Sequence, residues 1–150
     1  MRGFAMRPTK YSVHIDYLIA SVIYLGTQRG WWARRPSNLA YELSLDRDKL
    51  ELVFEAFPGI FRKSANPSDN GEHFYSLQAR YAQRDDYGQA EEKTDIPPLS
   101  VETVKLIYDF ILKAADDEGV RSRTLLGNAI AIGVALVGAV TAIAVASLKG

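Results

Sequence analysis

The chain has 150 residues, with 18 basic and 18 acidic side chains and therefore no net charge. This balance argues against a protein whose main partner is nucleic-acid phosphate, because such proteins normally carry a basic excess. The absence of cysteine excludes disulfides, thiolate metal sites and cysteine nucleophiles. Hydrophobic residues at 47% and charged residues at 24% are typical of a folded domain.

The first predicted element is a helix over residues 11–28. Its stretch 17–26, YLIASVIYLG, is apolar on nearly every side, and about ten residues are too few to span a bilayer. The stretch therefore predicts a buried core helix with more apolar surface than one packing face covers. This excess indicates that the helix also meets a partner or a second copy of the chain. Gly26 and Gly30 should end it before a short extended segment, WWARR.

Two helices joined by a tight turn come next. Pro36 suits the first turn of a helix that runs through NLAYELS. After Ser44 and Leu45, Asp46 is a good N-cap for a third helix, DRDKLELVFEAF. The apolar residues of the third helix recur at the i, i+3, i+4 and i+7 positions of one face, namely Leu50, Val53, Phe54 and Phe57.

A β-hairpin is predicted after the third helix, with GIFRKS and EHFYSLQARYA as its strands. Asn70 and Gly71 between them are a strong turn signal. Residues 10–84 resemble the winged helix-turn-helix superfamily, through LAYEL in the second helix, SLDRDKLE in the turn and third helix, and FYSLQARYA in the returning wing strand. The resemblance implies a mainly α, α+β winged-helix fold with a small β-hairpin wing, occupying a soluble domain of residues 1–87.

Winged helices most often bind DNA through the third helix, so its outward residues test that function. With the apolar row facing inward, the outward residues are Arg47, Asp48, Glu51, Leu52 and Glu55. A major-groove reader needs Arg, Lys, Asn or Gln at such positions, and three carboxylates repel a polyanion. We therefore predict that these five residues bind a protein, with Leu52 as the apolar anchor.

The wing strands carry the remaining candidates for phosphate contacts: Arg62, Lys63, Arg80 and Arg84. The wing tip, NPSDNGEH, adds no Lys or Arg. So few contacts favour at most weak nucleic-acid binding.

The sequence offers little for catalysis. It has no glycine-rich phosphate loop, no HExxH pattern and no Ser–His–Asp set, and its two histidines are His14 and His73. His14 adjoins the apolar face of the first helix, and His73 lies beside the hairpin turn, where we expect it to be solvated. We expect no catalytic residue, no cofactor and no metal.

Residues 88–100 are predicted to form a polar linker to an amphipathic helix over residues 101–119, which Ser100 caps. One side of that helix is apolar and carries Val104, Ile107, Ile111 and Ala114. The helix could pack on the body, pair with its copies or lie on a membrane. Its mixed charges weaken the membrane option, so we expect packing on the body or between copies.

Residues 124–148 contain no charged side chain. At 1.5 Å per residue this stretch extends about 37 Å, enough to cross a hydrocarbon core of about 30 Å. We predict one transmembrane helix within residues 121–148; the alternative is a buried helix at the centre of a soluble oligomer. Arg121 and Arg123 precede the stretch and only Lys149 follows it, which favours a cytoplasmic body on a single C-terminal anchor.

Small residues recur at four-residue spacing in this stretch, and such rows let helices associate in lipid. The candidates for self-association are Gly127, Ala131, Ala135, Gly138 and Ala142.

Together these features predict a tail-anchored membrane adaptor, oligomeric, with lipid and a protein as its partners and without nucleic acid. Two alternatives stay open. One is a membrane-tethered DNA-binding transcriptional regulator, and the other is a small membrane effector whose helices form an oligomeric pore.

Overall fold

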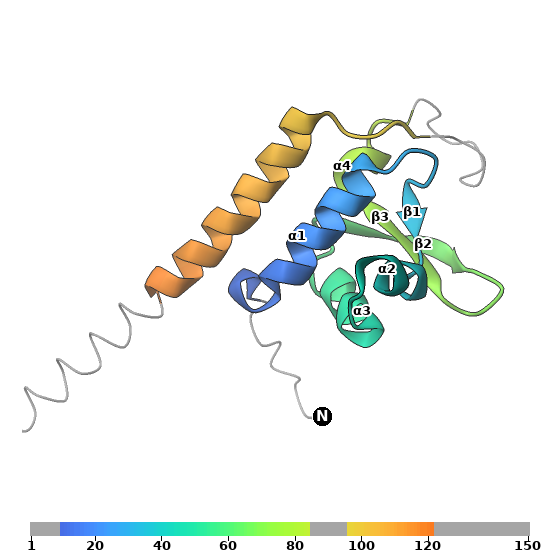
Figure 1. Ribbon diagram of the computed structural model, residues 1–150, viewed down its shortest axis with the longest axis horizontal. Coiled ribbons are helices and arrows are strands. Elements are labelled where there is room, and N and C mark those ends of the chain that lie inside the picture. Colours follow the sequence, from blue (N-terminus) through green and yellow to red (C-terminus); the bar gives the residue numbers. More distant parts are fainter. Residues whose placement is uncertain (1–9, 85–95, 122–150) are drawn as a thin grey trace, which may run out of the picture. The chain divides into compact units, whose positions relative to one another are not determined.

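The computed structural model describes residues 10–84 and 96–121. The chain divides into two compact units, Met1–Ala115 and Asp116–Gly150. The described elements are α1 (Tyr11–Thr27), β1 (Ala33–Arg34), α2 (Pro36–Leu43), α3 (Arg47–Ala56), β2 (Phe61–Pro67), β3 (His73–Leu77), α4 (Gln78–Tyr81) and a last helix over residues 101–121 (Figure 1).

The three strands form one antiparallel sheet in the order β1-β3-β2. Phe61 lies opposite Leu77 at the base of the β2–β3 hairpin, which we call the wing. The α+β class predicted from the sequence is confirmed. The order of the elements, with the α2–α3 pair preceding the wing, is consistent with a winged helix-like fold.

Local signals set the ends of the helices where the sequence predicts them. The side chain of Asp46 accepts a hydrogen bond from the backbone N–H of Lys49 at 2.9 Å, which confirms Asp46 as the N-cap of α3. Ser44 closes the turn before it in the left-handed region, with φ of 54°. Gly71 has φ of +82°, as the predicted hairpin turn at this position requires.

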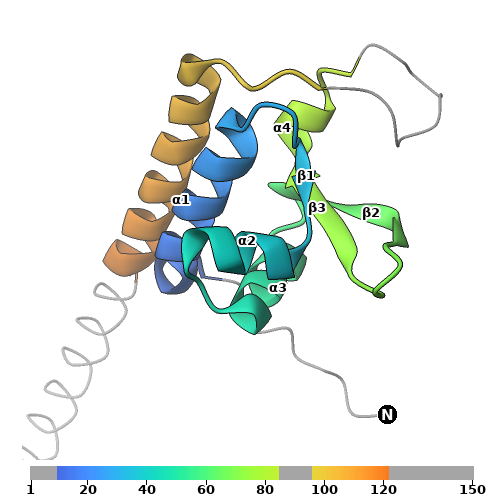
Figure 2. The same ribbon diagram turned by 45° about the vertical axis from the view of Figure 1, so that its right-hand side comes forward.

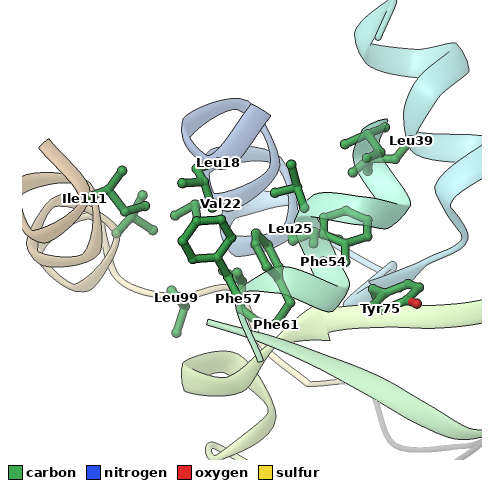
Figure 3. Packing of buried hydrophobic residues seen from close by; sticks show 14 residues of the cluster. Leu18, Val22, Leu25, Leu39, Phe54, Phe57, Phe61, Tyr75, Leu99 and Ile111 are labelled. Carbon is green, nitrogen blue, oxygen red and sulfur yellow. The ribbon is translucent and has the colours of Figure 1, made fainter. Parts of the chain in front are cut away.

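The core lies between α1, α3 and the sheet (Figure 3). The ring of Phe54 packs against Phe61 and Tyr75, with centroid distances of 4.6 and 4.8 Å. Burying a side chain of this size contributes about 1.5–3 kcal/mol to stability. The four predicted inward residues are all buried: Leu50, Val53 and Phe54 of α3, and Phe57 directly after it.

The last helix packs along α1, as Figure 2 shows for its residues up to Ala115. Ile111 and Val104 join the core from this helix, and the side chain of Ser100 accepts from the N–H of Thr103 at 3.2 Å, the predicted cap. A Cβ at Gly26 would lie 3.2 Å from Val104 Cγ2. Packing on the body, one of the expected alternatives, is therefore confirmed.

This packing covers part of the apolar surface of α1, for which the sequence predicted a partner or a second copy of the chain. Residues 96–115 of the same chain lie against one side of α1, where the N–H of Leu99 donates to the carbonyl of Gly26 at 2.9 Å. Val13 and Ile23 of α1 stay 68% and 44% exposed, so a further partner of this helix remains a prediction. Ile96 and Leu99, at the end of the predicted polar linker, are buried in this contact.

The returning wing strand is shorter than predicted. It ends at Leu77, and Gln78–Tyr81 turn into the short helix α4. The turn places the side chain of Arg80 inside the protein, where it is fully buried. A strand that continued through Arg80, as the sequence predicted, would not turn this side chain toward the carbonyl groups of Leu25 and Ile96 that it binds in the structure.

Candidate functional site

The outward side of α3 carries the five residues predicted to bind a protein: Arg47, Asp48, Glu51, Leu52 and Glu55, together called the α3 face. Glu51 is half-buried and the other four are exposed. Leu52 keeps 55% of its surface in solvent, so the predicted facing of the helix is correct. Nothing in the fold covers this leucine among the described residues.

Arg47 is held against the turn of the wing. Its Nε donates to Glu72 Oε1 at 2.8 Å, while its other guanidinium nitrogens lie 3.5 Å from Asp48 and 3.9 Å from Glu51. One guanidinium is thus shared among three carboxylates. The only cation of the predicted α3 face is therefore already paired with carboxylates of the same chain.

Glu72 joins three elements. Besides the bond from Arg47 of α3, it accepts a hydrogen bond at 2.6 Å from the hydroxyl of Ser37 in the first turn of α2. Burial raises the pKa of Glu72, but the hydrogen bonds from Ser37 and Arg47 outweigh it and hold that pKa below its ordinary value. Glu72 is therefore ionised at neutral pH and fixes the wing turn beside both helices.

Glu55 connects the other end of α3 to the wing strands. Its Oε1 accepts from Lys63 Nζ on β2 and from the Tyr75 hydroxyl on β3, each at 2.6 Å. The hydrogen bonds from Lys63 and Tyr75 lower the pKa of Glu55. Burial and the bond to Glu55 raise the pKa of Tyr75. Lys63, a predicted phosphate contact, is paired with a carboxylate.

The prediction that Arg80 contacts phosphate is wrong. Arg80 is fully buried, and its guanidinium donates to the Leu25 carbonyl at 2.8 Å and to the Ile96 carbonyl at 2.8 and 3.2 Å. A buried cation of this kind cannot reach a phosphate in solution. It instead ties the end of α1 to the segment that leads into the last helix.

The last two predicted contacts, Arg62 and Arg84, lie together over one aromatic ring. Their guanidinium carbons are 3.7 and 4.0 Å from the centroid of Tyr81, and the ring of Trp32 is 5.7 Å away. Stacking of this kind orients both guanidinium groups along the ring. The structure therefore brings Arg62 and Arg84 together. Lys63 instead binds Glu55, and Arg80 is buried.

Sequence reasoning missed Glu72 and Ser37 as parts of this region. Ser37 reads as an ordinary first-turn residue, and Glu72 as a solvated wing residue. The contacts join positions 35 residues apart (Ser37 and Glu72) and 25 apart (Arg47 and Glu72). The sequence marked only the turn itself, because Glu72 directly follows Asn70-Gly71.

The histidines have structural surroundings. His14 lies edge-on to Phe57, with ring centroids 6.1 Å apart. His73 is half-buried, with Nδ1 at 2.9 Å from the carbonyl of Ser64 on the opposite wing strand, which corrects the expectation that it is solvated. Within residues 10–84 and 96–121, no group of three His, Asp or Glu side chains is placed to hold a metal ion.

Residues 124–148 lie outside the described part of the chain, and with them the predicted self-association residues Gly127, Ala131, Ala135, Gly138 and Ala142. Of the helices that are described, none is long and apolar enough to cross a membrane.

Comparison with known proteins adds little. The sequence matches no protein-family model and no curated protein. A solved structure described as a possible transcriptional regulator from Methanosarcina mazei Go1 is similar over 75% of this chain and 75% of its own length, at 13% sequence identity and a TM-score of 0.36. A similarity at this level says nothing about what the chain binds.

Proposed function

We propose that the chain is a membrane-anchored adaptor whose winged helix-like body binds a protein through the α3 face. The observation that carries the proposal is the setting of Leu52. This leucine is 55% exposed on the helix that winged helices use for recognition, and carboxylates flank it. A single exposed leucine is ordinary, but its position at the centre of a fixed recognition helix is what a docking anchor requires.

The charges of the α3 face argue against duplex DNA as the partner. Asp48 and Glu51 would face the phosphates, while Arg47 would have to leave Glu72 to reach them. Lys63 on the wing is likewise bound to Glu55. Non-specific affinities of DNA-binding proteins are only about 10⁻⁴ to 10⁻⁶ M at physiological salt, and this surface should do no better.

The same charges indicate which kind of protein segment would fit the α3 face. An apolar side chain surrounded by carboxylates suits a segment that offers an apolar pocket or side chain together with Lys or Arg. Apolar burial would then supply the affinity, and the charges would select the partner and speed its approach.

Two matched variants of the full chain test this assignment. Leu52→Asp adds a charge to the α3 face, and Tyr41→Asp adds the same charge to α2 at a side chain that is 89% exposed. Both should fold. Affinity purification from membranes should lose its co-purifying protein with Leu52→Asp and keep it with Tyr41→Asp. Equal loss or equal retention in the two variants would contradict the assignment.

The membrane part of the proposal is supported by the sequence of residues 124–148, which lack any charge. The full chain should remain in the membrane pellet after carbonate extraction, whereas a chain that ends at Arg121 should be released. The flanking charges favour a cytoplasmic body, so protease added to sealed cells should leave the body intact. Release of the full chain by carbonate would remove the anchor from the proposal.

A DNA-binding regulator tethered to a membrane is the second candidate, because the element order of the body favours it. A tight, sequence-dependent complex with duplex DNA that Arg47→Ala abolishes would establish this candidate in place of the adaptor.

A further inference from the structure

The residues before α1 have a composition opposite to that of the α3 face. Residues 1–10, MRGFAMRPTK, carry three basic residues, Arg2, Arg7 and Lys10, and the first acidic residue of the chain is Asp16. Phe4 and Met6 lie between the two arginines. The α3 face presents Leu52 among carboxylates, so the two surfaces are complementary in both charge and apolar character.

The structure shows where this segment joins the body. The ring of Tyr11, the first residue of α1, packs against Phe57 with a centroid distance of 4.7 Å. Phe57 directly follows α3, and Glu55 of the α3 face is two positions earlier in the chain. The start of α1, to which residues 1–9 are joined, therefore lies beside the C-terminal end of α3.

The segment is long enough to follow the helix. Nine extended residues reach at most about 30 Å, and α3, with ten residues, is about 15 Å long. Because the segment is tethered, its effective concentration at the α3 face is in the millimolar range, so even weak complementarity suffices to populate the contact.

We propose that residues 1–9 dock on the α3 face, with Phe4 or Met6 against Leu52 and the arginines against Asp48 and Glu51. The inference deepens the proposed function and rests on it for its consequence, because a protein partner would have to displace this segment. Such a partner would need the same chemistry as residues 1–9, namely a basic segment that carries an aromatic or aliphatic side chain.

The natural absence of cysteine allows a direct test in the full chain. Ala5→Cys and Lys49→Cys place one thiol on the segment and one beside the α3 face, since Lys49 is exposed and three positions from Leu52. All proposed contact residues are retained. Under mild oxidation we expect an intramolecular disulfide, measured as the rate of its formation by mass spectrometry.

Charge reversal supplies the control at unchanged tether length. Asp48→Lys with Glu51→Lys should slow disulfide formation by about fivefold or more through loss of the docked population. Adding Arg2→Glu and Arg7→Glu should restore the rate. The introduced lysines would by themselves favour the thiolate and speed the reaction, so slowing cannot arise from cysteine reactivity. A thermal melt of each variant confirms that the body stays folded.

Equal rates in the parent and the charge-reversed chain would overturn the inference, because the segment would then be a free tether. Disulfides formed chiefly between two chains would overturn it in favour of docking by a second copy. If the disulfide test fails while Leu52→Asp still removes a co-purifying protein, the proposed function stands and only this inference is wrong. If Leu52→Asp has no effect on co-purification but the disulfide behaves as expected, the docking stands without a competing partner.

Discussion

Arg47 of α3 and Glu72 of the wing form a hydrogen-bonded ion pair, with 2.8 Å between Nε and Oε1. The pair connects α3 to the wing turn and occupies the only cation of the α3 face. Because Glu72 is mostly buried and also binds Ser37, the pair is better fixed than an ordinary surface ion pair, whose contribution is about 0–1 kcal/mol.

Glu72→Gln should release Arg47 and raise the weak affinity for duplex DNA. One additional phosphate contact should steepen the dependence of log K on log salt by about one. Fluorescence anisotropy of the full chain at several salt concentrations measures both quantities. Glu42→Gln is the control, since it removes the same charge from an ion pair with Arg34 at 2.7 Å. If the two variants behave alike, Arg47 is not the cation that Glu72 withholds.

Stability should decrease in acid through Glu55 and Glu72. Both have a pKa below the ordinary value in the folded protein, so their stabilising effect is complete above the unfolded pKa of about 4.3 and is lost as the pH falls through the folded pKa. Thermal melts from pH 7 to pH 3 should therefore show a steeper loss below about pH 4.3 in the parent than in Glu55→Gln with Glu72→Gln. Parallel curves would mean that neither carboxylate is stabilised in the fold.

Leu52→Asp should leave folding nearly unchanged and Phe54→Asp should abolish it, although only two positions separate these residues on α3. Leu52 is exposed and Phe54 is 2% exposed. A surface change typically alters stability by about 0.5 kcal/mol or less, whereas a carboxylate in the core costs about 4 kcal/mol or more. Circular dichroism melts of the body should show a near-normal transition for the first variant and none for the second. Comparable unfolding by both would require a different facing of α3.

Arg80→Met should destabilise the body although it replaces a charge by an apolar side chain. The substitution leaves the carbonyls of Leu25 and Ile96 without their donor, at about 1–3 kcal/mol for each unpaired buried group. Arg80→Lys should not rescue it, because an ammonium group lacks the planar fork that serves two carbonyls. Hydrogen exchange should show the loss first in residues 96–115. Unchanged exchange there would mean that Arg80 does not hold this segment.

Local patterns predicted most of α3 and the turns. The i, i+3, i+4, i+7 row placed Leu50 and Phe54 inward, and Asp46 and Gly71 marked a helix start and a turn, because each signal depends on residues that are close in sequence. The exposure of Leu52 followed from the same row.

Contacts between distant segments were not predictable in this way. The burial of Arg80 depends on Leu25, 55 residues away, and on Ile96, and a cation in a polar run reads as exposed. The cover of α1 by residues 96–115 likewise depends on how a later helix packs, which amphipathicity alone leaves open between the body, a copy and a membrane.

Photo-crosslinking at Leu52 tests the claim that the α3 face binds a protein. A benzophenone amino acid replaces Leu52 in the full chain, with Tyr41 as the matched exposed position, and Arg2→Glu with Arg7→Glu keeps residues 1–9 off the face. Irradiation in membranes should give protein adducts of higher mass at position 52 well above those at position 41. Adducts to nucleic acid at position 52, or equal protein adducts at both positions, would contradict the claim.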